Sequence, residues 1–334
     1  MLWFWIGFFA LIAFLLFLDL GVLHRKAEEQ SFKSALAWTV GWVGLGLSFA
    51  VVVYLIFENA WLGATLQASD GKPHGGADAA MVYLAAYLLE QALSVDNIFV
   101  ISLVFRSFRV PSKHQHRVLF WGIMGAIVFR VAMLVGGAEL AQRFTWIFYV
   151  FGGYLVWSGL KLFKPEGDEA DNPLENSRVV RLVRRFIPVV EGDHDGKFLV
   201  RDRGRRALTT LAVCLIVVEL TDVVFALDSI PAVLAVSEDK FIMVTSNIFA
   251  IMGLRSLYFV LAGAMAQFHY LKYALALLLI LIGAKMIAHD HYHVANEVSL
   301  GLIAGILATG VVASIVASKR AARRTASDHC PAAR

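Results

Sequence analysis

The stretch YLLEQALSVDNIFVISLVF, residues 87–105, is almost wholly apolar, yet it contains two carboxylic acids, Glu90 and Asp96, and the amide Asn97. Its length and composition are typical of a membrane-crossing helix, because a hydrocarbon core of about 30 Å takes about 20 mostly apolar helical residues. An acidic side chain at the centre of such a helix costs about 2.5–3.5 kcal/mol to insert. The two carboxylates therefore point to a polar site inside a membrane protein.

The rest of the chain supports a membrane protein. Of its 334 residues, 59% are hydrophobic and only 17% are charged, and the mean hydropathy is +0.68. These values lie well outside the range of soluble domains. Nine stretches are long and apolar enough to cross a bilayer: 3–23, 35–57, 80–104, 117–137, 145–163, 207–233, 241–265, 270–288 and 297–317. We predict an all-α polytopic protein, with one transmembrane domain over residues 1–320 and a basic cytoplasmic tail over 321–334.

The charges between these stretches predict an orientation. Basic residues gather after the first and third stretches, through residues 164–206 and in the tail, whereas the alternate loops are acidic or contain histidine. The positive-inside rule then puts the N-terminus outside, the C-terminus in the cytoplasm and residues 164–206 in a cytoplasmic loop. The basic runs are more simply explained as topology signals than as a nucleic-acid-binding surface. The two cysteines, Cys214 and Cys330, give neither a disulfide framework nor a cysteine-based metal site.

The opening motif occurs twice. Residues 90–98 read EQALSVDNI and residues 222–230 read DVVFALDSI, and in each an acid is followed after five residues by Asp, a small polar residue and Ile. Downstream, GIMGAIVFR ending at Arg130 matches NIFAIMGLR ending at Arg255. A three-helix unit is therefore duplicated, over residues 80–163 and 207–288. With nine crossings the two units are inverted, a common plan of secondary transporters, whose binding site lies where the repeats meet.

The polar residues of the two copies form a candidate ion site. Oxygen donors without cysteine or paired histidine favour hard or borderline divalent cations such as Mn²⁺, Mg²⁺ or Ca²⁺. Clustered carboxylates can also share protons, which suits the exchange of a metal for protons. The candidate ligands are Glu90, Asp96, Asn97, Glu219, Asp222, Asp228 and Ser229. Glu219 and the further acid Asp19 fit an ion site and a packing role equally well.

The charges can also be interpreted as purely structural groups that fix the packing of the helices. Arg130 and Arg255 lie deep in their stretches and are expected to balance the acids, so that buried ion pairs alone could fix the helix packing. On an unbroken helix Glu90 and Asn97 lie about 20° apart and Asp96 about 120° away, so the motif could not converge on one point. Pro231 lacks an N–H and frees a backbone carbonyl. We therefore expect a kink or unwound turn in 207–233, and also consider one in 80–104.

Four segments resemble the TerC family of integral membrane proteins. They are EQALSVDNIFV, ELTDVVFALDSIPAVLAVSEDKFIMVTSNIFAIMGLRSLYF, LDLGVLHRK and FRVPSKHQHRVLFWGIMGA, and the resemblance runs from about residue 15 to about residue 315. It implies a bacterial inner-membrane protein of the Alx type, within the LysE-like transporter superfamily. The family takes its name from tellurite resistance, and its members are associated with manganese efflux and with the supply of Mn²⁺ to exported enzymes. The family's acidic motif residues correspond to the candidate ligands above, Asp19 apart.

These observations predict a secondary transporter that exports a divalent cation, with Mn²⁺ as the first candidate, in exchange for protons. We expect no enzymatic activity, no permanently bound cofactor and no nucleic-acid partner; protein partners in the membrane or among exported proteins are unknown. A non-transporting membrane scaffold in tellurite or envelope stress resistance is the alternative. A membrane redox enzyme fits less well, because the spans offer no paired histidines for haem. The polar run His289 to His293 is read as an interhelical loop rather than a metal site.

Overall fold

The structure of the chain is a computed structural model, and it is almost wholly helical. It describes residues 2–17, 32–61, 66–67, 73–144, 146–163, 189–190, 192, 195–202, 205–262, 271–288 and 295–328. The helices are α1 (Leu2–Phe17), α2 (Phe32–Glu58), α3 (Gly76–Ser107), α4 (Ser112–Arg143), α5 (Ile147–Leu162), α7 (Thr210–Leu234), α8 (Lys240–Met252), α9 (Leu254–Ala262), α10 (Leu271–Ile287) and α11 (Asn296–Asp328).

Two small sheets accompany the helices. Strands β1 (Leu66–Gln67) and β2 (Pro73–His74) pair antiparallel. In the second sheet β5 (Arg205–Thr209) is central, antiparallel to β4 (Leu199–Asp202) and parallel to β3 (Val189–Val190). The segment 164–206, predicted as a cytoplasmic loop, thus contains short strands at its end, and residues 164–188 lie outside the described part.

The helices confirm a multi-pass integral membrane protein. Each of the nine apolar stretches falls mainly on a helix, with 241–265 on the pair α8 and α9 and the first residues of 207–233 in β5. The ends of 3–23 and 241–265 and the first residues of 145–163 and 270–288 lie outside the described residues. Among the described residues, five helices are long and apolar enough to cross a membrane, namely α2, α3, α4, α7 and α11. The bent pair α8 and α9 makes a sixth if it counts as one span, while α1 and α5 are shorter apolar helices.

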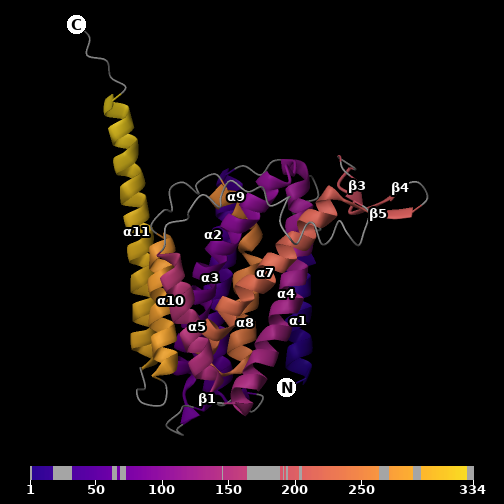
Figure 1. Cartoon of the computed structure of the whole chain (residues 1–334). Coiled ribbons are helices and arrows are strands. Elements are labelled where there is room, and N and C mark those ends of the chain that lie inside the picture. The colour runs from indigo at the N-terminus through magenta and orange to yellow at the C-terminus, as the bar shows by residue number, and fades with distance from the viewer. Residues whose placement is uncertain are drawn as a thin grey trace.

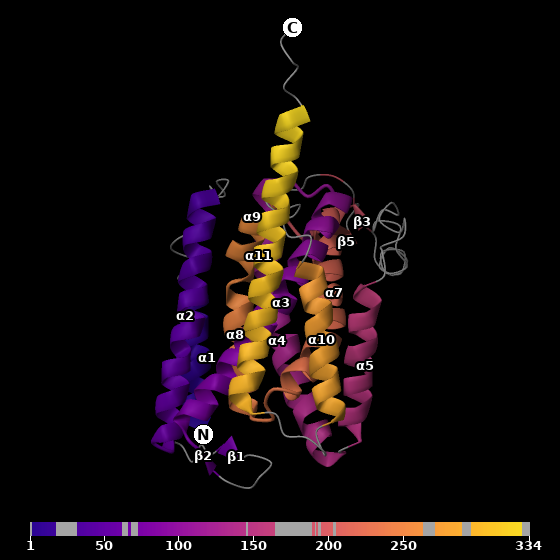
Figure 2. The same ribbon diagram turned by 90° about the vertical axis from the view of Figure 1, so that its left-hand side faces the viewer.

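The helices form one bundle with a small sheet at each end (Figure 1). The strands β1 and β2 lie at one end, and β3, β4 and β5 lie at the other (Figure 1). Since β2 leads into α3 and β5 leads into α7, these two helices enter the bundle from opposite ends and run antiparallel. Figure 2 shows α11 alongside α10, with the end of α11 protruding beyond the other helices at the β5 end. The two copies of the acid motif are therefore presented on antiparallel helices.

Two clusters of buried apolar side chains hold the bundle together. One joins α1, α2, α3, α4, α7, α8 and α9 around residues such as Phe49 and Phe249, whose rings lie 4.6 Å apart. The other joins α3, α4, α5, α7, α8, α10 and α11 around Leu155 and Leu278. Helices α3, α4, α7 and α8 contribute to both clusters, so the acid motifs are carried by two of the helices that link the apolar cores.

Close contacts at glycines join α5 to α10, which lie side by side in the bundle (Figure 2). A Cβ atom on Gly159 would lie 2.7 Å from the carbonyl oxygen of Ala276, and one on Gly283 would lie 2.6 Å from the carbonyl oxygen of Gly152. Both distances are too short for a real Cβ atom, so the two backbones touch only because these side chains are absent.

This contact gives a stability prediction for α5. In Gly152→Ala the new Cβ would lie 2.8 Å from the carbonyl oxygen of Gly283 and 2.7 Å from Ile287 Cγ1. Overpacking of this kind costs about 1–3 kcal/mol, so the variant should unfold at a lower temperature in detergent. The matched control is Gly153→Ala, because the neighbouring position is exposed and nothing lies within 4 Å of its Cβ. Equal melting temperatures for the two variants would contradict the prediction.

The unwound turn expected in 207–233, and considered in 80–104, is wrong. Both α3 and α7 are continuous, and α7 runs through Pro231 to Leu234. The proline lies in the last turn of α7, where its missing N–H costs one hydrogen bond, and its own carbonyl accepts from Ala235 N at 3.0 Å.

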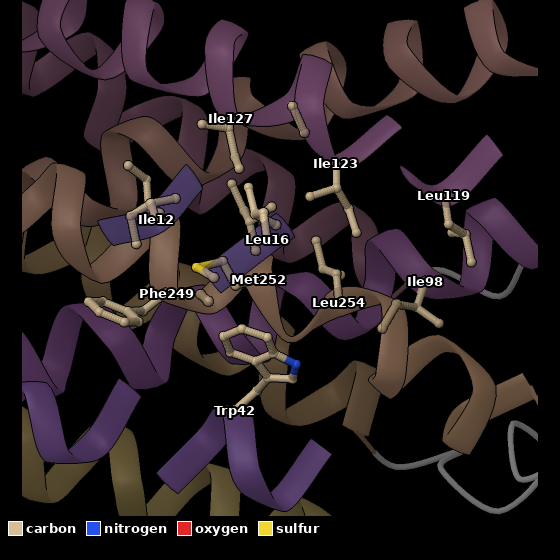
Figure 3. Packing of buried hydrophobic residues seen from close by; sticks show 14 of the residues in the cluster. Ile12, Leu16, Trp42, Ile98, Leu119, Ile123, Ile127, Phe249, Met252 and Leu254 are labelled. Carbon is tan, nitrogen blue, oxygen red and sulfur yellow. The ribbon is translucent and has the colours of Figure 1, made fainter. Parts of the chain in front are cut away.

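The helix break lies in the next crossing instead. Helices α8 and α9 meet at Gly253 with a bend of 43°. The indole of Trp42 from α2 lies over this bend, beside Met252 and Leu254 (Figure 3). All three side chains are buried. The sequence signal for this break was the single glycine of NIFAIMGLR, which we used only to match the repeats.

Candidate ion site between α3, α4 and α7

Arg130 of α4 lies at the centre of the buried polar groups. Its side chain is 1% exposed, and its Nη1 donates to Glu90 Oε2 at 2.8 Å. Its Nη2 donates to Asp222 Oδ1 at 2.9 Å and its Nε to Asp222 Oδ2 at 3.2 Å. This is the two-pronged geometry in which a guanidinium binds a carboxylate most firmly. The first acids of both motif copies therefore share one buried cation.

The two motif copies also touch each other directly. Asn97 Nδ2 of α3 donates to Asp222 Oδ1 of α7 at 3.4 Å. Glu90 is fully buried, whereas the Asp222 side chain is 14% exposed. The ion pairs thus form one connected network rather than two separate ones.

A cavity of about 40 Å³ lies beside this network. Its polar lining consists of Asp96, Asn97, Arg130, Ser158, Asp228 and Ser229. The matched second acids and small polar residues of both copies therefore face one space. That space exceeds the roughly 10–15 Å³ that a water molecule needs, so it has room for a few water molecules or for a largely dehydrated ion.

Several oxygens around the cavity are buried without satisfied hydrogen bonds. The Asp228 carboxylate interacts with Tyr154 and Ser158 of α5, and Lys161 is also near. Within the described residues, however, Asp228 Oδ1 and Ser229 Oγ have no hydrogen-bond partner. Buried oxygens of this kind are available to water or to a cation.

Two predicted residues lie apart from the cavity. Glu219, one turn before Asp222, is half-buried against Gly125 of α4, where a Cβ atom would collide with its carboxylate. Arg255 is buried in α9 and does not line the cavity. Asp19 and the run His289 to His293 lie outside the described residues.

The carboxylates do not form a preassembled metal cage. In the part of the chain that the structure describes, no three His, Cys, Asp or Glu side chains lie close enough together to hold a metal ion. The geometry explains this, because Arg130 lies between Glu90 and Asp222 and a continuous α3 turns Asp96 away from Glu90.

Three polar residues at the site were not predicted from the sequence. Asn247 of α8 is 1% exposed and interacts with the Glu90 carboxylate. Its signal was an amide at the start of the apolar run NIFAIMGLR. Tyr154 and Ser158, which approach Asp228 from α5, were also missed, since a hydroxyl on an apolar helix is too common to stand out.

A bundle of apolar helices that buries charged groups from both copies of a motif defines a polytopic membrane protein with a polar site inside its transmembrane part. The chain belongs to the TerC family: the model described as "Integral membrane protein TerC family" matches residues 75–325. The resemblance found in the sequence motifs is thereby confirmed.

Relatives match over nearly the whole chain. An uncharacterized membrane protein of Myxococcus xanthus is 44% identical over 317 residues, which cover 95% of this chain and 93% of the relative. A Photorhabdus laumondii protein named "Putative membrane-bound redox modulator Alx" is 40% identical over 94% of this chain and 95% of the relative. The Escherichia coli K12 protein of the same name is 41% identical over 91% of each chain. No solved structure matches the chain.

Proposed function

We propose that this protein exports a divalent cation, Mn²⁺ first among them, across the bacterial inner membrane in exchange for protons. The observation that carries the proposal is the convergence of both acid motifs on one place. The first acids, Glu90 and Asp222, bind Arg130, and the second acids, Asp96 and Asp228, face the adjoining cavity. Carboxylate, amide and hydroxyl oxygens are ligands suited to Mn²⁺.

In this proposal Arg130 compensates the acids while the metal is absent. A divalent cation entering the cavity would attract Asp96 and Asp228 directly and would compete with the guanidinium for Asp222. Metal would leave when protons from the outer side neutralise the carboxylates, since like charges held close together favour protonation. The ion pairs of Arg130 with Glu90 and Asp222 thus stabilise the site without metal, and metal binding would rearrange these same ion pairs.

The architecture of nine crossings with inverted repeats is part of the proposal, as is the place of the family in the LysE-like superfamily. Antiparallel α3 and α7 support the inversion. The glycine contacts of α5 and α10 support it too. The spacing that matches Gly159 with Gly283 also matches Gly152 with Ala276. Replacing each residue by its match in the other copy converts the contact between Gly159 and Ala276 into the contact between Gly283 and Gly152. Both contacts are present, as expected for two related copies.

One observation favours the scaffold alternative. No three metal-ligating acidic, histidine or cysteine side chains gather within the described ranges, and a buried network of Arg130, Glu90 and Asp222 could serve packing alone. A scaffold would bind no metal and move none. The two functions therefore differ in a single measurable property.

The decisive measurement is metal flux in proteoliposomes. The purified protein is reconstituted with an imposed pH gradient, and uptake of Mn²⁺, Mg²⁺ and Ca²⁺ is compared with that of protein-free vesicles. If the protein exchanges metal for protons, uptake of at least one of these ions should be faster when the vesicle interior is more acidic than the outside, so that protons flow out as the metal enters. Dissipating the pH gradient should slow this uptake. Flux equal to that of empty vesicles for all three ions would reject transport and leave the scaffold.

A further inference from the structure

The buried amide of Asn247 is a polar group that the apolar packing of α8 does not explain. It lies on α8 with 1% of its surface exposed, in an apolar helix. Among the described residues neither Asn247 Oδ1 nor Asn247 Nδ2 has a hydrogen-bond partner of ordinary geometry. A buried amide left in that state is unfavourable, and natural proteins keep such a group chiefly where it binds something.

The amide interacts with an acid of the candidate site. The Asn247 side chain interacts with the Glu90 carboxylate. Glu90 uses Oε2 for Arg130, while its Oε1 is buried without a partner in the described part of the chain. One turn further along the same face of α3, the buried Ser94 Oγ is in the same condition. Three unsatisfied oxygens, from carboxylate, amide and hydroxyl, are thus available on α3 and α8.

The two motif copies differ at this position. The match of GIMGAIVFR with NIFAIMGLR aligns Asn247 with Gly122, which has no side chain. Only the second copy therefore supplies an amide, and it does so on the crossing that is broken at Gly253, six residues further on. Transporter sites are often built on interrupted helices of this kind.

We propose that Asn247 is a ligand of the transported cation, which its amide oxygen binds together with Glu90 when Arg130 withdraws. The inference rests on the proposed transport function and deepens it, because it adds a neutral oxygen donor from α8 to the acids of α3 and α7. A neutral donor binds the metal without adding to the negative charge of the empty site. It also favours a cation that accepts mixed carboxylate and carbonyl ligands, as Mn²⁺ and Ca²⁺ do.

The test is Asn247→Leu, studied by MnCl₂ titration of thermal unfolding in detergent and by Mn²⁺ flux in proteoliposomes. Leucine is close in size and needs no hydrogen bond. The metal-free melting temperature should therefore stay the same or rise, while the Mn²⁺-induced rise should disappear and the KM for Mn²⁺ should increase at least tenfold. The control is Ser246→Ala, because the Ser246 hydroxyl donates to Met243 O within its own helix at 3.2 Å. This control should keep the wild-type response.

A second variant covers the case in which leucine prevents folding. Asn247→Asp keeps an oxygen donor beside Glu90 and adds a charge, so Mn²⁺ should raise its melting temperature more than it raises that of the wild type. If Asn247 only supports packing, Asn247→Leu will lower the metal-free melting temperature and keep the Mn²⁺ response, and the inference is overturned. The failures remain distinguishable: no flux in the wild type rejects transport, whereas wild-type flux with unchanged KM in Asn247→Leu rejects this ligand alone.

Discussion

Replacing Arg130 with glutamine should be the most destabilising of the substitutions considered. The change leaves the fully buried Glu90 and the partly buried Asp222 without the guanidinium that now binds both. Removing one partner of a buried ion pair costs about 3–5 kcal/mol, because the remaining charge has lost its solvent and its counter-ion together. The protein should therefore be recovered in lower yield and should unfold at a clearly lower temperature in detergent.

The same variant also tests whether a metal can take the place of the guanidinium. If the acids form an ion site, Mn²⁺ should restore part of the stability lost in Arg130→Gln and should raise its melting temperature more than that of the wild type. Glu90→Gln should be milder, since Asp222 would still bind Arg130 through two hydrogen bonds.

A surface arginine on the same helix provides the control. Arg143 is 71% exposed and lies 3.6 Å from Glu139 one turn away. Exposed pairs contribute about 0–1 kcal/mol, so Arg143→Gln should unfold almost as the wild type does. Equal stability of the Arg130 and Arg143 variants would show that the buried network is not what holds α3, α4 and α7 together.

The largest effect on transport is expected from Asp96→Asn combined with Asp228→Asn. These substitutions neutralise both carboxylates that line the cavity and keep their shape, while the ion pairs of Arg130 remain. Mutation of residues that only hydrogen-bond to metal ligands typically costs about 10–100-fold in metal affinity or activity. Loss of two anionic groups that bind the metal directly should therefore reduce Mn²⁺ flux by at least about 100-fold.

Two exposed acids of the same chemistry form the matched control. In Glu139→Gln combined with Glu238→Gln the same number of charges is removed outside the cavity, where both side chains are exposed. Flux should then remain close to that of the wild type. Transport that survives in the Asp96 and Asp228 variant, in protein shown to be folded by its melting curve, would exclude these carboxylates as the ion's ligands.

Hydropathy and motif repetition predicted the helices well, because an apolar stretch of about 20 residues has few other uses. The stretch 80–104 became α3 over Gly76–Ser107, and 207–233 became α7 over Thr210–Leu234. The position of the helix break was not predictable by the same reasoning. A proline was the stronger local signal, but Pro231 falls where the helix ends, while Gly253 bends its crossing within packed surroundings.

The residues of the site could be predicted from the sequence, but the contacts between them could not. The repeat identified Glu90, Asp96, Asp222 and Asp228, yet nothing in one sequence indicates that Arg130 binds the first acid of each copy while the second acids face a cavity. Those contacts depend on how far each helix is rotated about its axis. Asn247 was missed for the same reason, since only the packing of α8 on α3 brings its amide to Glu90.

The position of Trp42 over the bend between α8 and α9 has a consequence for helix α2, which lies outside both copies of the repeat. With 13 and 9 residues, neither α8 nor α9 can cross about 30 Å of hydrocarbon alone, so the peptide groups at Gly253 lie at membrane depth. A peptide group without a hydrogen bond would cost several kcal/mol there, and the Gly253 carbonyl accepts from Leu257 N and from Ser256 Oγ, both at 3.0 Å. The indole of Trp42 covers these peptide groups (Figure 3). A Cβ atom added to Gly253 would lie 3.5 Å from the Cβ atom of Trp42. Helix α2 thus shields the bent backbone between α8 and α9 from the fatty-acid chains of the bilayer.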